Sequence, residues 1–210
     1  MAITFPRTLP NLSDIQQVMT RQKTLVSVSE GLFSGVQQLQ KQPFQRWEIE
    51  YTVIPLNRED MDVWWSWLVS LNGREKTFYG VLQAPNEIKG LAKNYSNPQL
   101  NGIHAARLGS LSIDTGPSGI TGYLKEGDFI QLGSTTESRL HMVLEDVATN
   151  GSGQATFDIW PDTQASYSDN ATVTVSSPKG LFRLMQNTVE IIQDGSNTRK
   201  GLRFGAAGVI

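Results

Sequence analysis

NREDMDVWWSWLVSLNG, residues 57–73, carries three of the five Trp in the chain and shows both ends of a helix. Asn57 is a residue type that caps a first helical turn, and the acidic Asp60 follows at the reciprocal capping position. The Asn-Gly pair that closes the stretch tolerates the left-handed conformation with which many helices end. The stretch therefore predicts one short helix over residues 58–71.

Apolar side chains recur at helical spacing along this stretch and form one broad face. That face consists of Met61, Trp64, Trp65, Leu68 and Leu71. Burying one large apolar side chain contributes roughly 1.5–3 kcal/mol, so we expect the helix to lie on a sheet. The structural core that we expect around it consists of Trp47, Trp64, Trp65, Leu68 and Phe78.

The residues around the helix alternate between apolar and polar, which is typical of strands. Residues 45–53 (QRWEIEYTV) form the cleanest strand, and residues 76–82 (KTFYGVL) form a return strand. A hairpin is expected over residues 24–39, and the polar run before it, residues 13–23, is expected as a loop or short helix. These elements predict a small α+β unit whose helix covers a sheet.

The second half of the chain changes character. Residues 83–102 are rich in Pro, Gly and Asn without an apolar period, which indicates a linker or long loop. Between residues 106 and 185, short alternating runs recur, separated by Gly, Pro, Ser and Asn, which is typical of an antiparallel barrel or sandwich. Residues 188–204 predict two further strands around an Asp-Gly-Ser-Asn turn.

Together these patterns predict a mainly β (α+β) fold. We expect residues 1–88 to form a β-sandwich or barrel with one Trp-rich helix, completed by residues 187–210. An antiparallel β-barrel or sandwich over residues 103–186 is inserted, with residues 83–102 as the linker. A tandem order of two domains is the alternative.

Composition excludes several classes of function. The 210 residues carry 18 Lys and Arg against 20 Asp and Glu, a net charge of −2 without the basic footprint of a nucleic-acid-binding protein. The absence of Cys removes disulfides, thiolate zinc sites and Cys nucleophiles, and two His are too few for most His-based metal sites. No secretory signal or membrane span is recognisable, so we expect synthesis in a cytoplasm.

Catalytic patterns are weak. Glu145 with Asp146, and Asp158 with Asp162, are the paired carboxylates that glycoside hydrolysis would need. Adjacent strand residues point to opposite sides, so we expect these four carboxylates on solvated faces. His141 could belong to a Ser/His/Asp set, but no Gly-x-Ser-x-Gly turn frames a nucleophilic Ser. We therefore predict a protein that is not an enzyme and binds no cofactor or metal.

Two segments, residues 127–133 (GDFIQLG) and 139–187, resemble a pattern found in the distal tail (tail-hub or baseplate) protein family of long-tailed bacteriophages and gene-transfer particles. The residues that carry this resemblance are Gly127, Asp128, Gln131, Gly133, Gly153, Thr156, Ile159, Pro161, Pro178, Gly180, Phe182 and Arg183. The Trp-bearing strand and Trp-rich helix of the N-terminal half are similar to the hub domain of that family. Where the family has an Arg-rich ending after its Ile-x-Pro strand, this chain has Asp162-Thr163-Gln164.

The resemblance implies a virion structural protein that forms a ring, commonly a homohexamer, at the distal end of the phage tail. Such a ring joins the tail tube protein and the tape-measure protein to the tail hub and fibre proteins, and DNA leaves through it without sequence-specific binding. Each subunit of a ring makes a heterologous contact, and the strand over residues 76–82 is expected as an edge that pairs across it.

Two other classes of function stay open. A carbohydrate-binding or host-recognition module of a phage tail tip would hold sugar on exposed aromatic side chains, with Trp160 as the possible ligand aromatic and a core residue as the alternative. An enzyme such as a cell-wall hydrolase comes third. Glycan binding that depends on Trp160 would favour the module, and degradation of an envelope polymer would favour the enzyme.

Overall fold

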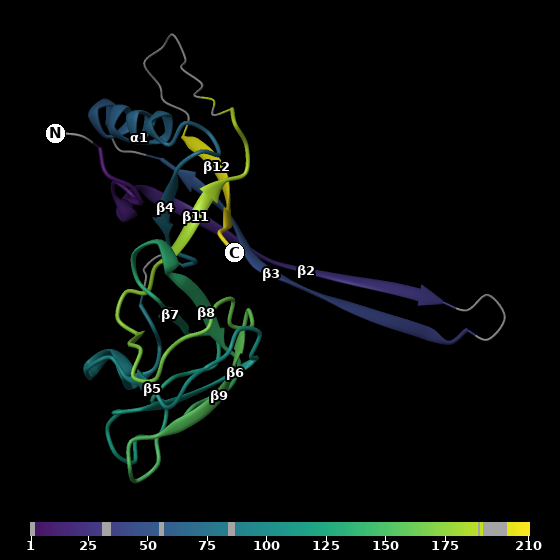
Figure 1. The fold of residues 1–210 in the computed structure, drawn as a ribbon. Coiled ribbons are helices and arrows are strands. Elements are labelled where there is room, and N and C mark those ends of the chain that lie inside the picture. The colour runs from purple at the N-terminus through teal and green to yellow at the C-terminus, as the bar shows by residue number, and fades with distance from the viewer. Residues whose placement is uncertain (1–2, 31–34, 55–56, 84–86, 189, 191–200) are drawn as a thin grey trace.

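The structure, a computed structural model, describes residues 3–30, 35–54, 57–83, 87–188, 190 and 201–210. The mainly β class predicted from the alternating patterns is confirmed: the strands form two curled or nearly closed sheets and a single α-helix is described (Figure 1). The strands of the second sheet lie in the sequence between the fourth and eleventh strands, which both belong to the first sheet. The chain therefore leaves the first sheet, builds the second and returns.

The first sheet has six strands in the order β1-β4-β11-β12-β3-β2. Their bounds are β1 Arg7–Thr8, β2 Ile15–Glu30, β3 Gln37–Val53, β4 Thr77–Gly80, β11 Gly180–Leu184 and β12 Leu202–Gly208. A short 3-10 helix, η1, spans Leu12–Asp14. β1 and β4 are parallel, and the other neighbouring pairs are antiparallel.

The predicted helix is present as α1, Arg58–Ser70, and lies across one end of the first sheet (Figure 1). Its expected cap is confirmed, because the side-chain oxygen of Asn57 accepts a hydrogen bond from the Asp60 N–H at 2.8 Å. The expected exit is confirmed too, because Asn72 and Gly73 have φ angles of 51° and 61°. Sequence signals at both ends thus fixed this helix within one residue.

The helix buries a slightly different face from the predicted one. Trp64 and Trp67 are buried, whereas Trp65 is only partly buried at the edge of the core. At about 100° per residue, Trp67 lies about 60° and Trp65 about 100° around the axis from Trp64. Trp67 therefore lies closer than Trp65 to the side of the helix that faces the sheet, and only Trp67 is fully buried.

The predicted loop or short helix over residues 13–23 is wrong, because most of that run belongs to β2. β2 pairs with β3 from Ile15 opposite Val53 to Glu30 opposite Gln37, forming one long hairpin that projects from the molecule (Figure 1). Residues 13–23 are mostly polar and show no apolar period, so the first part of this strand was missed, whereas the strand pairing expected over residues 24–39 is present. Pro43 lies where the register with β2 shifts, a position that needs no ladder donor.

The predicted return strand is present as β4, but it is not an edge. β4 lies between β1 and β11, so both of its sides are hydrogen-bonded within the chain. The expectation that residues 76–82 pair across a subunit contact is therefore wrong. The edges of this sheet are β1 and β2.

The first core lies between α1 and the sheet. Of the predicted core residues, Trp47, Trp64, Leu68 and Phe78 are buried there. Four apolar side chains of β3, predicted to share one side, are buried in this core, and the hydroxyl of Tyr51, one of the four, bonds both backbone groups of Val81.

The second sheet also has six strands, in the order β10-β7-β8-β9-β6-β5. Their bounds are β5 Gln99–Leu100, β6 Ser110–Asp114, β7 Phe129–Leu132, β8 Arg139–Val143, β9 Ala155–Trp160 and β10 Val173–Thr174. A bridge between Gln99 and Thr172 joins its two edges. This contact nearly closes the sheet around its own apolar core, in agreement with the predicted barrel or sandwich.

Three segments differ from the predicted organisation. Residues 83–102 include the 3-10 helix η2, Leu91–Asn94, and β5, and bury side chains in the second core, so they are more than a linker. β11 was expected in the second module but pairs with β4 and β12 of the first sheet. The turn predicted within residues 194–197 lies outside the described residues, and one strand, β12, follows it.

None of the helices in the described part of the chain has the length and apolar character that crossing a bilayer requires.

Candidate subunit-interaction surfaces

The outer part of the β2–β3 hairpin, which we call the hairpin arm, comprises residues 21–30 and 35–41, and every one of these residues is exposed. Lys41 ties its base to the second sheet through an ion pair with Asp162, with Nζ and Oδ2 3.4 Å apart. Five aliphatic side chains of the arm are between 47% and 71% exposed: Leu25, Val26, Val28, Val36 and Leu39. Such a density of exposed aliphatic groups indicates a contact surface.

The strand register brings part of this apolar surface together. Val28 pairs with Leu39, and Val26 pairs with Lys41. Cross-strand partners point to the same face of a ribbon, as do residues two apart on one strand. Val26, Val28 and Leu39 therefore form one apolar stripe, which we call the arm stripe.

A groove of about 540 Å³ opens beside the base of the hairpin, between the two sheets, and we call it the intersheet groove. Its apolar lining consists of Trp47, Leu82, Phe129, Met142, Leu144 and Trp160. The Trp47 ring lies edge-on to Trp160 and Phe129, with centroids 4.3 and 5.6 Å apart. Trp47 from the first sheet thus forms the floor against aromatic rings from the second.

Most hydrogen-bonding groups around the groove are already engaged within the chain. The Thr20 hydroxyl donates to the Leu82 carbonyl at 2.8 Å, and the Gln83 amide donates to the Glu87 carbonyl at 2.7 Å. The Trp47 indole N–H donates to the Leu140 carbonyl at 3.1 Å. The groove consequently presents apolar surface with few free donors.

Trp160, the predicted ligand aromatic, lies at the end of β9 and lines this groove while half-buried. It pairs with Met142 across β8 and β9 and packs against Trp47. The core alternative applies in part, because Trp160 packs against the first core, and the ring also borders the groove.

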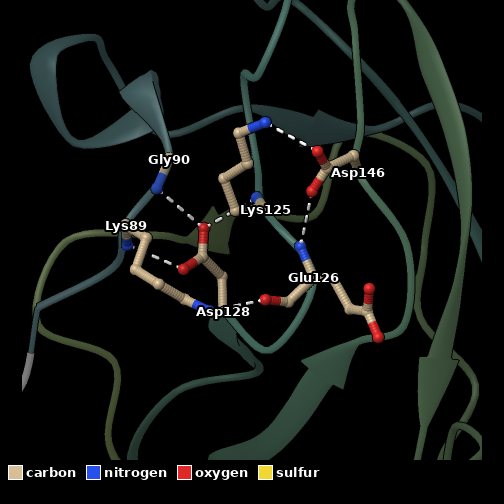
Figure 2. A network of polar contacts seen from close by, with 6 residues as sticks. All are labelled: Lys89, Gly90, Lys125, Glu126, Asp128 and Asp146. Carbon is tan, nitrogen blue, oxygen red and sulfur yellow. Dashed lines mark hydrogen bonds and ion pairs between the residues drawn. The ribbon is translucent and has the colours of Figure 1, made fainter.

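Asp128, from the family-like Gly-Asp motif, holds the segment that enters the second sheet (Figure 2). One carboxylate oxygen accepts from the Lys89 N–H at 2.7 Å, and the other accepts from the Gly90 and Lys125 N–H groups at 2.9 and 2.8 Å. A Cβ at Gly90 would lie 2.5 Å from the Tyr123 carbonyl oxygen. The acidic residue of the motif therefore fixes the path of the backbone.

A second, exposed layer surrounds this carboxylate (Figure 2). Asp146 binds the Lys125 ammonium at 2.6 Å and accepts from the Glu126 N–H at 3.1 Å. The hydrogen bond from Lys125 lowers the pKa of Asp146. Lys89 completes the layer by donating to the Glu126 carbonyl at 2.7 Å. Backbone N–H groups and the Lys125 ammonium already bind the oxygens of Asp128 and Asp146. The network therefore has a structural role and holds these segments together.

The motif glycines close turns. Gly133 has a φ of 73°, and a Cβ there would lie 2.4 Å from the Glu137 carbonyl oxygen. Gly153 has a φ of 76°, and a Cβ there would lie 2.1 Å from the Gly116 carbonyl oxygen. Gly127 also has a positive φ, of 83°. Only glycine fits these backbone positions without rearrangement.

Gln131, in the middle of the motif, connects the second sheet to the segment that leads into β11 of the first sheet. The Gln131 side-chain oxygen accepts from the Lys179 N–H at 2.9 Å, just before β11. Pro178 is buried beside it. A Cβ at Gly180 would lie 2.9 Å from Leu140 Cγ, so the two sheets approach closely here.

The remaining motif residues lie on or near strands. Ile159 and Phe182 are buried in the second and first cores, and Thr156 shares a hydrogen bond with the Ser112 hydroxyl at 2.8 Å. Pro161 is buried after β9. Arg183 is exposed and, with Arg46 and Arg74, lines a cavity of about 300 Å³ on the first sheet.

The carboxylates considered for catalysis lie at or near the surface. Glu145, Asp146 and Asp158 are exposed, and the Glu145 carboxylate accepts from the Asp158 N–H at 3.2 Å. His141 is fully buried, which lowers its pKa to about 4, and its Nδ1 lies 2.7 Å from the Pro161 carbonyl oxygen. Among the described residues, no group of three or more His, Cys, Asp or Glu is placed to hold a metal ion.

Sequence reasoning identified Trp160 and the strands of the arm but not the groove. Leu82, Phe129 and Leu144 come from three separate segments, and no local pattern links them. Searches of protein families and of curated proteins find no match to this chain.

Proposed function

We propose that this protein is a structural subunit of the tail of a long-tailed phage or gene-transfer particle, in which copies join into a ring, commonly a hexamer, at the distal end of the tail tube. The observation that carries the proposal is the hairpin arm, which extends from the body and exposes five aliphatic side chains. A partner that buries these side chains accounts for the arm.

The energetics of the arm favour such a partner. A two-stranded hairpin without a covering layer is at best marginally stable in water. Burying the exposed parts of five aliphatic side chains would contribute roughly 5 kcal/mol gross. Association costs about 4–15 kcal/mol in lost freedom, so the arm supplies an anchor and further contacts must complete the interface.

The position of the arm supports a ring over a symmetric dimer. The arm projects from one side of the subunit, so it meets a different surface on its neighbour, and contacts of this heterologous kind close into rings when the rotation permits. In the proposed virion such a ring would join the tail tube and tape-measure proteins to the hub and fibre proteins. DNA would pass through it without sequence-specific binding.

The second candidate is a carbohydrate-binding or host-recognition module, and the observation that favours it is the position of Trp160 beside the intersheet groove. Sugars require several free donors and acceptors around an aromatic surface. Most polar groups of this groove are engaged internally, which makes this candidate the weaker one. Glycan binding lost in a folded Trp160→Ala variant would reverse that order.

The mass of the protein in solution tests the proposal. Light scattering coupled to size exclusion should give a multimer for the natural sequence and for an Ile103→Asp control, since Ile103 is exposed outside the arm and the groove. A double variant, Val28→Asp with Leu39→Asp, should be monomeric because it puts charges into the arm stripe. A natural protein that stays monomeric at the highest attainable concentration would refute the proposal.

A further inference from the structure

We infer that the intersheet groove of one copy receives the arm stripe of a second copy. The inference rests on the proposed self-assembly and goes beyond it, because it names the surface that accepts the arm. Both surfaces are apolar, and both are open to solvent on the chain as described.

The chemistry of the groove selects aliphatic side chains. Its lining holds no charged residue, and two of its three polar side chains, Thr20 and Gln83, already donate to backbone carbonyls. A hydroxyl-rich ligand would lose its bonds to water here without replacing them. An aliphatic surface has no hydrogen bonds to water to lose, and it gains contact with the aromatic rings of Trp47 and Trp160.

The arm stripe is compact enough to enter the groove. Val28 and Leu39 are cross-strand neighbours, and Val26 is two residues away on the same strand, so three aliphatic groups form one compact ridge. A groove of about 540 Å³ is within the range of sites that enclose a ligand of comparable bulk. The ridge and the groove are thus complementary in chemistry and scale.

The contact must join two copies. Gln22 lines the groove at the base of the hairpin, and Val28 lies six residues further along β2, about 20 Å away. The paired strands between them keep the stripe away from the groove of the same chain. Because each subunit carries one stripe and one groove on different surfaces, the contact can repeat from copy to copy.

Site-directed cross-linking tests the inference, and the natural chain contains no Cys to interfere. Leu39→Cys in one batch of protein is mixed with Leu144→Cys in another and treated with a short bifunctional maleimide. Leu39 and Leu144 are 71% and 41% exposed, so neither change opens a cavity in the core. The matched control pairs Leu39→Cys with Ile103→Cys, which is exposed and outside the groove.

The inference predicts a heterodimeric adduct in the Leu39–Leu144 mixture and at least tenfold less adduct in the control. A chain that carries both Cys should give a ladder of adducts above the dimer. An assembled sample whose adduct yield equals the control overturns the groove assignment and leaves the ring proposal standing. A monomeric sample without adduct overturns both.

A second readout does not depend on cross-linking. Leu144→Asp places a charge at the rim of the groove and should raise the protein concentration needed for assembly at least tenfold. Ile103→Asp should leave that concentration unchanged. Equal assembly of the two variants, with both folded by circular dichroism, would contradict the inference.

Discussion

Asp128→Asn removes one charge and changes almost no volume, and it tests whether the Gly-Asp motif holds the entry into the second sheet. The carboxylate accepts three backbone hydrogen bonds of 2.7–2.9 Å, and the residue is 1% exposed. Hydrogen bonds to a charged group contribute about 1.5–3 kcal/mol each. An amide keeps one acceptor oxygen and turns an NH₂ group toward at least one N–H donor, so we expect a loss of roughly 2–4 kcal/mol.

Urea unfolding followed by circular dichroism measures this loss, and the control is Asp146→Asn in the exposed layer of the same network. The control should lower the unfolding midpoint much less, because Asp146 is exposed and a surface ion pair contributes little. Amide hydrogen exchange at Lys89, Gly90 and Lys125 should accelerate only in Asp128→Asn. If the two variants unfold at the same urea concentration, the buried carboxylate does not hold this segment and the reasoning fails.

Three further predictions concern the cores. Tyr51→Phe leaves the buried N–H and C=O groups of Val81 without their partner and should lower the unfolding free energy by roughly 2–4 kcal/mol in urea titrations. Trp67→Ala should cost about 3–5 kcal/mol, and Trp65→Ala clearly less by the same assay, because only Trp67 is fully buried. Burial lowers the pKa of His141 from 6.5 to about 4 in the folded chain. Between pH 6.5 and pH 4 the unfolded chain therefore binds a proton at His141 that the folded chain does not. Stability should therefore fall by about 3 kcal/mol as pH drops from 6.5 to 4, and His141→Gln should flatten that slope.

Local signals were sufficient for the elements whose structure is determined locally. Asn57 and the Asn-Gly pair delimit α1 because caps act on the neighbouring backbone alone. The alternation from Trp47 to Val53 identified a strand because one side of it is buried and the other is not. Asp128 was singled out as part of a family-like motif, and only the structure shows that its carboxylate accepts hydrogen bonds from the Lys89 and Gly90 N–H groups.

Pairing between distant strands could not be predicted from local patterns. β11 alternates like the strands before it, and only its partners β4 and β12 place it in the first sheet. Residues 16–23 of β2 gave no strand signal because they are mostly polar, although they pair with β3. Both faces of the outer ribbon lie in solvent, so the exposed side chains of Val28 and Leu39 are the feature on which the proposed contact between copies is based.

The candidate interaction surfaces were only half visible in the sequence. Trp160 was recognised as an aromatic at a strand end, but Leu82 and Leu144 had no feature that set them apart. A groove of this kind depends on how two sheets pack, and packing is a property of the whole chain.

The central claim is that copies of this chain close into a ring. Electron-microscope images of the main size-exclusion peak, classified by symmetry, test it most directly. We expect closed rings with a central opening, in which each subunit extends an arm toward one neighbour. Monomers, or closed two-fold dimers without an opening, would contradict it.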